Sequence, residues 1–130
     1  MPKVLVIEPD RVLAENLKSA LIKAGYQVHW NRDLQAAVES VDQYQPAVII
    51  MDLATGGHGG VEFLYELRSY PEWQNLPVII CSSTPLPELA NLSRALSELN
   101  ISSFHYKPKT SLEQIVDSIA LAVERARVSL

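Results

Sequence analysis

Side chains capable of acid–base or phosphoryl chemistry stand directly after several short apolar runs in this chain. The apolar runs are residues 4–7, 47–51, 78–81 and 104–106, and the polar residues behind them include Glu8, Asp10, Asp52, Ser82 and Lys107. In an open parallel sheet, ligands lie outside the carboxyl ends of the strands. Carboxylates, a hydroxyl and an ammonium gathered there suit a divalent metal and a phosphoryl group. The pattern therefore predicts a phosphoryl-transfer site, in which Pro9 interrupts the first acidic cluster.

Length and composition favour a single domain over residues 1–130. The longest apolar stretches are about five residues, far below the ~20 that a membrane-spanning helix needs. Because no signal peptide precedes the first strand, we expect a cytoplasmic protein without a membrane partner. A net charge of -4 argues against nucleic-acid binding, which usually needs a basic patch. The single cysteine, Cys81, lies in an apolar run and is expected to be a buried thiol.

Strand patterns and helix patterns alternate along the whole chain. Strands are expected at residues 3–8, 26–30, 47–52, 78–82 and 103–106, and helices at 11–24, at 33–44, behind the glycine loop 56–60, behind Pro87 and at 111–126. Five consecutive strand–helix units imply a parallel sheet with helices on both faces. We predict an α/β fold, a doubly wound, flavodoxin-like three-layer sandwich with strand order 2-1-3-4-5. In that order the switch point lies beside the first and third strands, which end in Glu8 and Asp52.

Five marks together resemble the receiver domain of two-component response regulators, over nearly the whole chain. They are the acidic turn Glu8–Asp10, Asp52 behind the third strand, Gly60 eight residues later, Ser82 behind the fourth strand, and Lys107–Pro108 behind the fifth. None of these marks is specific alone. All five in the family's order make a strong resemblance.

The resemblance implies a role for each residue of the site. Asp52 is then the phosphoacceptor, modified by a histidine kinase or a phosphotransfer protein. Lys107 holds a phosphoryl oxygen, and Ser82 donates a hydrogen bond to the phosphoryl group. Phe104 is then the switch aromatic, whose rotamer follows that hydroxyl. Mg²⁺ is the implied cofactor, and its implied ligands are Glu8, Asp10, Asp52 and the backbone carbonyl of Ala54.

The resemblance also implies how the protein signals. Phosphorylation would shift a surface made by the helix behind Pro87, strand 103–106 and helix 111–126, to which a downstream protein binds. A homodimer through the same surface is an expectation by family analogy alone. The peptide bond between Lys107 and Pro108 is expected to be cis. The chain is then a signalling phosphoacceptor and no enzyme, with at most self-phosphorylation and self-dephosphorylation.

Pro9 is the main departure from the family pattern. The family usually has two adjacent acids behind the first strand, and Pro9 takes the place of the second, which is the main metal ligand. Asp10, one residue later, either replaces that ligand or caps the following helix. Ser82, likewise, either serves the phosphoryl group or satisfies a backbone group at the strand end. An alternative function follows, an atypical pseudo-receiver that binds proteins without being phosphorylated.

Other site classes fit the sequence less well. A flavodoxin needs a hydroxyl- and glycine-rich phosphate loop behind the first strand, where Glu8 would repel phosphate. An aspartate-nucleophile phosphatase usually carries a second Asp two residues behind the first, and Ala54 holds that position. His29, His58 and His105 share no metal-ligand spacing, which argues against zinc.

Overall fold

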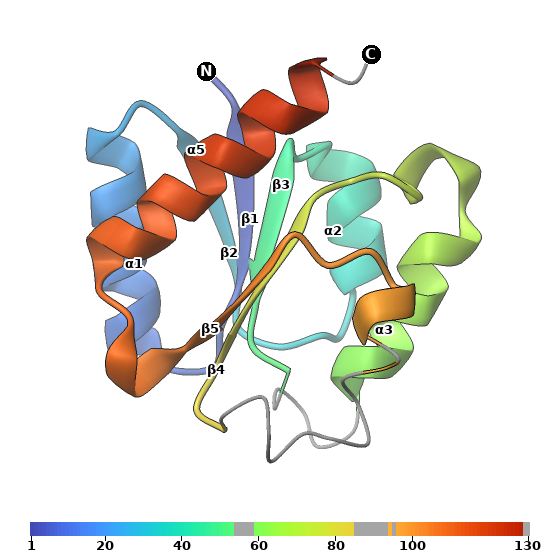
Figure 1. Ribbon diagram of the computed structural model, residues 1–130, viewed down its shortest axis with the longest axis horizontal. Coiled ribbons are helices and arrows are strands. Elements are labelled where there is room, and N and C mark those ends of the chain that lie inside the picture. The colour runs from blue at the N-terminus through green and yellow to red at the C-terminus, as the bar shows by residue number, and fades with distance from the viewer. Residues whose placement is uncertain (54–58, 85–93, 95, 129–130) are drawn as a thin grey trace.

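The computed structural model describes residues 1–53, 59–84, 94 and 96–128. The elements are β1 (Lys3–Ile7), α1 (Arg11–Lys23), β2 (Gln27–Asn31), α2 (Ala37–Tyr44), β3 (Val48–Met51), α3 (Gly59–Ser69), η1 (Pro71–Trp73), β4 (Val78–Ser82), β5 (Ser103–Tyr106), η3 (Lys107–Lys109) and α5 (Leu112–Val128), η1 and η3 being 3-10 turns (Figure 1). All four strand pairings are parallel and the strand order is β2-β1-β3-β4-β5. The predicted order is therefore confirmed. The helix expected behind Pro87 falls largely outside the described residues.

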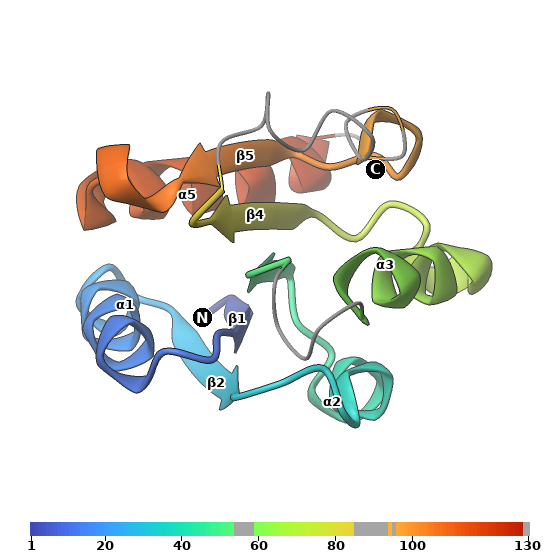
Figure 2. The same cartoon turned by 90° about the horizontal axis from the view of Figure 1, so that it is seen from below.

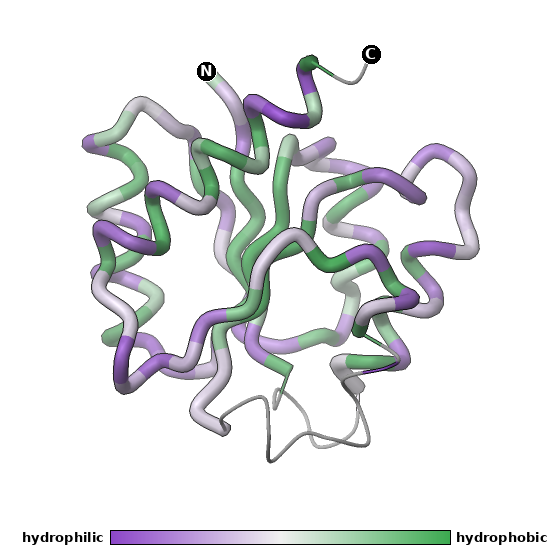
Figure 3. Tube along the Cα trace, viewed as in Figure 1, coloured by the Kyte–Doolittle hydropathy of each residue, from purple (hydrophilic) through white to green (hydrophobic). Residues whose placement is uncertain are grey.

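Helices cover both faces of the sheet, as the sequence predicts. Figure 2 shows α1 and α5 on one face and α2 and α3 on the other. The residues of β1 alternate between two hydrophobic clusters: Val4 and Val6 face α1 and α5, whereas Leu5 and Ile7 face α2 and α3. Because both faces are covered, the central strands are apolar along their length, which Figure 3 shows as a hydrophobic centre. This core holds the strand ends in register.

The ends of the first two helices differ in how well the sequence predicts them. Asp10 caps α1, and Gly25, with a φ of +98°, follows its last turn. The second helix begins at Ala37, four residues later than the expected start at residue 33. The Asp33 side chain accepts a hydrogen bond from the Gln35 N–H at 2.9 Å, a local turn that competes with helix formation. This turn explains the later start.

The expected cis peptide bond before Pro108 is wrong. No cis bond occurs among residues 1–53, 59–84, 94 and 96–128, so Lys107 and Pro108 are joined in trans. Pro108 lies in the 3-10 turn η3. The fixed φ of proline suits the first turn of a helix, where its missing N–H leaves no bond unmade.

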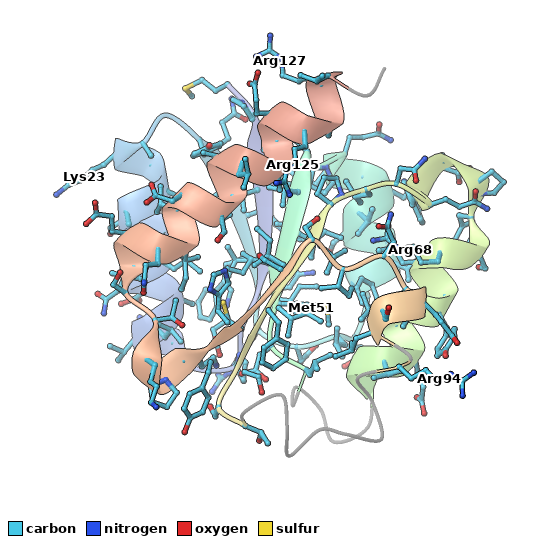
Figure 4. The ribbon with its side chains drawn as sticks, in the orientation of Figure 1. Lys23, Met51, Arg68, Arg94, Arg125 and Arg127 are labelled. Atoms are coloured by element: carbon cyan, nitrogen blue, oxygen red, sulfur yellow. The ribbon has the colours of Figure 1, made fainter. Side chains whose placement is uncertain are left out.

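Arg68, which the sequence analysis did not single out, fastens the far end of α3 to two loops. Its guanidinium donates to the carbonyl oxygens of Trp73, Leu76, Leu99 and Asn100 at 2.7, 2.8, 2.9 and 3.0 Å (Figure 4). Burial lowers the pKa of this guanidinium. The five donors of arginine suit such a set of carbonyls.

Of the helices described, none is long and apolar enough to cross a bilayer.

Candidate functional site

Four of the predicted site residues lie at the same edge of the sheet. Glu8, Asp52 and Lys107 directly follow β1, β3 and β5, and Ser82 ends β4. The N–H of Asp52 donates to the Ile7 carbonyl at 3.0 Å, which continues the β1–β3 pairing up to both acids. Glu8, Asp52 and Ser82 are nonetheless buried, at 4%, 3% and 3% exposure. Polar groups so buried need partners.

The Lys107 ammonium joins the two acids. Its Nζ lies 2.7 Å from Oε1 of Glu8 and also contacts Oδ2 of Asp52. Burial raises the pKa of Glu8, although the hydrogen bond from Lys107 acts in the opposite direction. Burial disfavours the Lys107 charge, but hydrogen bonds to Asp52 and Glu8 outweigh it and raise the pKa of the ammonium. The site therefore holds a charged lysine between two carboxyl groups.

Apolar surface lies beneath this ion pair. A cavity of about 90 Å³ is lined by Glu8, Lys107 and apolar residues of α1, α5 and the sheet, among them Leu13 and Ile115. Cys81 also lines it, and burial raises the pKa of this thiol to about 12. Cys81 is thus the buried thiol that the sequence predicts. Apolar surroundings strengthen electrostatic interactions within the site.

Asp10 caps α1, one of the two roles left open by the sequence, and its role as a metal ligand stays a prediction. Its Oδ1 accepts hydrogen bonds from the N–H groups of Val12 at 2.9 Å and Leu13 at 3.2 Å, which caps α1. Its own N–H donates to Oε2 of Glu8 at 3.1 Å. Within the described part of the chain, no group of three His, Cys, Asp or Glu residues is placed to hold a metal. Ala54, the expected carbonyl ligand, lies outside the described residues.

Ser82 ends β4 and Phe104 lies in β5, as the sequence predicts. Each of them contacts residues nearby in the fold. The Ser82 hydroxyl accepts a hydrogen bond from the Thr84 N–H at 3.0 Å, the backbone-satisfying role that the sequence left open. Phe104 is half-buried against the cluster under α2 and α3, and pairs in register with Ile80 of β4. A hydroxyl can both accept this bond and donate its proton elsewhere. The phosphoryl role of Ser82 stays a prediction.

Trp30 is the site neighbour that the sequence analysis missed. Its indole Nε1–H donates to the backbone carbonyl of Glu8 at 2.8 Å. The available signal was its position near the end of an edge strand, beside the acidic turn. A half-buried tryptophan usually finds an acceptor for its N–H. The identity of that acceptor requires the fold.

Comparisons with known proteins show which family the chain belongs to. Residues 4–120 match the model of the response regulator receiver domain. Response regulator MprA of Mycobacterium leprae is 25% identical over 126 residues, 96% of this chain and 52% of the relative. KdpE of Escherichia coli, a KDP operon transcriptional regulatory protein, is 31% identical over 83 residues, 64% of this chain and 36% of the relative. The chain thus spans about a third to a half of these curated relatives.

Solved structures show the same fold. The receiver domain of the Francisella response regulator 1452 has a TM-score of 0.82 and 25% identity, covering 97% of this chain and 99% of its own. A response regulator receiver domain protein from Clostridium thermocellum has a TM-score of 0.84 and 20% identity over 100% of both chains. Together with the family match over residues 4–120, the acids and the lysine at one sheet edge lead to a single conclusion. This chain belongs to the response regulator receiver domain family.

Proposed function

We propose that Asp52 accepts a phosphoryl group from the phosphohistidine of a histidine kinase or a phosphotransfer protein. A carboxylate oxygen of Asp52 attacks phosphorus, the P–N bond breaks, and its electron pair leaves on the histidine nitrogen. The observation that carries this proposal is the contact of Lys107 with both Asp52 and Glu8 at the carboxyl edge of the sheet. This cation stands where the negative charge of an incoming phosphoryl group would develop.

Mg²⁺ fits the donor chemistry of the site. Magnesium in proteins often takes only one or two carboxylates, with phosphoryl oxygens and water completing its shell. Glu8 and Asp52, joined through Lys107, are two such carboxylates, and the carbonyl of Ala54 is a third donor by family resemblance. Bound Mg²⁺ would supply charge neutralisation for the phosphoryl oxygens. Lys107 would turn from the carboxylates toward a phosphoryl oxygen, and Ser82 would donate its proton there.

The partners follow from the same proposal. The curated relatives are named as response regulators or transcriptional regulators, and this chain would receive its signal from a kinase in the same way. Its output would be a changed surface over β5, α5 and the residues before β5, which a downstream protein or a second copy contacts. The chain would then act as a signalling phosphoacceptor and not as an enzyme with turnover.

Intact mass spectrometry tests this function directly. The protein is incubated with acetyl phosphate, with and without Mg²⁺, beside Asp52→Asn, which keeps the side-chain shape and removes the nucleophile. We expect a gain of one phosphate that requires both Mg²⁺ and Asp52. An unmodified but folded wild-type protein would overturn the proposal.

A second candidate, a pseudo-receiver that binds its partner without phosphorylation, is favoured by the acidic turn. Pro9 has no side-chain oxygen, Asp10 caps α1, and Lys107 already neutralises part of the charge on Glu8 and Asp52. A Mg²⁺ titration of the wild type and of Pro9→Asp separates the candidates. If the wild type binds Mg²⁺ weakly and Pro9→Asp binds it at least tenfold more tightly, Pro9 is the cause of the weak binding. Equal binding by both proteins would show that Pro9 does not limit the site.

A further inference from the structure

Every polar group of Glu8 has a protein partner, and two of these partners come from β2. The backbone N–H donates to the Asn31 carbonyl at 3.1 Å, and the backbone carbonyl accepts the Trp30 indole N–H at 2.8 Å. The carboxylate takes the Asp10 N–H on Oε2 and Lys107 on Oε1. The carboxyl ends of β1 and β2 are therefore joined at Glu8, whose carboxylate shares the Lys107 ammonium with Asp52.

Pro9 restricts the backbone of Glu8, whose carbonyl bonds the indole. A residue before proline is held to extended backbone conformations, and Glu8 lies one residue beyond the last residue of β1. The Glu8 N–H bonds the Asn31 carbonyl of β2, and the Glu8 carbonyl accepts its hydrogen bond from the Trp30 indole of the same strand. The indole N–H thus satisfies a part-buried carbonyl, and an indole is a donor only.

Trp30 is also held from its other side. Its ring packs against the cluster beneath α1 and α5, which includes Val4, Val6 and Leu17. The next residue, Asn31, donates from its side-chain amide to the Ser40 hydroxyl at 2.7 Å. The end of β2 is consequently fixed to the sheet core and to α2, and it gives Glu8 a rigid support.

We propose that Trp30 is a positioning residue of this site, which fixes Glu8 so that its carboxylate holds the Lys107 ammonium against Asp52. Without the indole N–H, the Glu8 carbonyl loses its partner and the acidic turn gains freedom. The Glu8 carboxylate then bonds Lys107 less often. The consequence for phosphorylation rests on the function proposed above, whereas the geometry of the ion pair does not.

NMR of the Lys107 side chain in Trp30→Phe tests this positioning role. Phenylalanine keeps an aromatic ring at position 30 and removes only the donor and part of the ring area. We expect the Lys107 ammonium protons to exchange with water about three- to tenfold faster, the size expected for one lost hydrogen bond, and the Glu8 carbonyl carbon to shift. Trp73→Phe is the matched control, since Trp73 lies in η1, before the amino end of β4, and should change neither signal.

Two further measurements keep the proposal open to refutation. In the wild type, a scalar coupling across the hydrogen bond from Trp30 Nε1 to the Glu8 carbonyl carbon should be present, and its absence overturns the proposal even if Trp30→Phe does not fold. Unchanged Lys107 exchange in a folded Trp30→Phe overturns it as well. Acetyl phosphate labelling of Asp52 should be about three- to tenfold slower in this variant. A wild type that is never labelled refutes the proposed function, while the Lys107 signal still decides the role of Trp30.

Discussion

Gly60 packs directly on the backbone of Leu53, the residue that follows Asp52. A Cβ atom at residue 60 would lie 2.5 Å from the Leu53 carbonyl oxygen and 3.0 Å from its Cα. Real Cβ atoms do not approach backbone so closely, and backbone cannot turn aside as a side chain can. The start of α3 therefore sets how the chain leaves β3, and only glycine permits that approach.

Gly60→Ala is expected to destabilise the protein by about 1–3 kcal/mol, because the clash forces the backbone apart. Gly59→Ala is the matched control. Its Cβ would meet only the movable Leu34 side chain, at 3.2 Å, and alanine favours a helix by up to about 1 kcal/mol over glycine. Urea unfolding followed by circular dichroism measures both changes. Equal effects of the two substitutions would contradict the role given to Leu53.

Arg68→Lys is expected to destabilise the protein by about 1–3 kcal/mol. Lysine keeps the charge but cannot span four carbonyl groups, and it leaves part-buried acceptors without donors. Arg94→Lys is the control, because the Arg94 side chain is 92% exposed and pairs only with Glu98 at 3.5 Å among the described contacts. Thermal unfolding should shift for position 68 and hardly at all for position 94. A loss at position 94 as large as at position 68 would refute this interpretation.

The strands and their order could be predicted from the sequence because burial on both faces demands continuous apolar runs. The polar residue behind each run then marks the strand end, so the site emerges from the same pattern. Glu8, Asp52 and Lys107 come together as the sequence analysis expects.

The contacts that sequence reasoning missed involve backbone carbonyls. Trp30 bonds the carbonyl of Glu8, and Arg68 bonds four others. Every residue type offers the same carbonyl, so no pattern of side chains identifies the acceptor. The start of α2 was misjudged for a related reason, since the bond from Gln35 to Asp33 is local and overrides the apolar periodicity.

Ala36→Gly is expected to stabilise the protein by about 0.5–1 kcal/mol. Ala36 has a φ of 64°, in the left-handed region, and its side chain makes no capping bond to α2. A left-handed conformation costs a residue with a Cβ about 1–2 kcal/mol. Glycine avoids this cost, but it loses more conformational entropy on folding, which offsets part of the gain. Ala37→Gly, one residue later and buried in α2, should instead lose about 1 kcal/mol or more. Chemical denaturation of both variants distinguishes the two positions by the sign of the change.

Acidification is expected to weaken the fold through His105. Burial lowers the pKa of His105 below the ordinary value of 6.5. Below that ordinary value the unfolded chain takes up a proton that the folded chain resists, so stability falls as the pH decreases through this range. Unfolding free energies of wild type and His105→Gln at about pH 7.5 and about pH 5.5 measure the effect. A larger decrease in the wild type supports it, and an equal decrease in both proteins refutes it.

Lys107→Met is expected to destabilise the protein by about 2–4 kcal/mol, because it removes the cation between two buried carboxyl groups. Part of this loss should return on acidification. The pKa of Glu8 is already raised by burial, and without Lys107 it rises further, so the folded state takes up a proton before the unfolded state does. Stability then increases as the pH decreases through that raised pKa.

Lys109→Met, at an exposed neighbouring position, is the control and should show neither the loss nor its recovery. Urea unfolding at about pH 7 and about pH 5 provides both measurements. A loss that does not depend on pH would mean that the cost arises from packing and not from the two carboxyl groups.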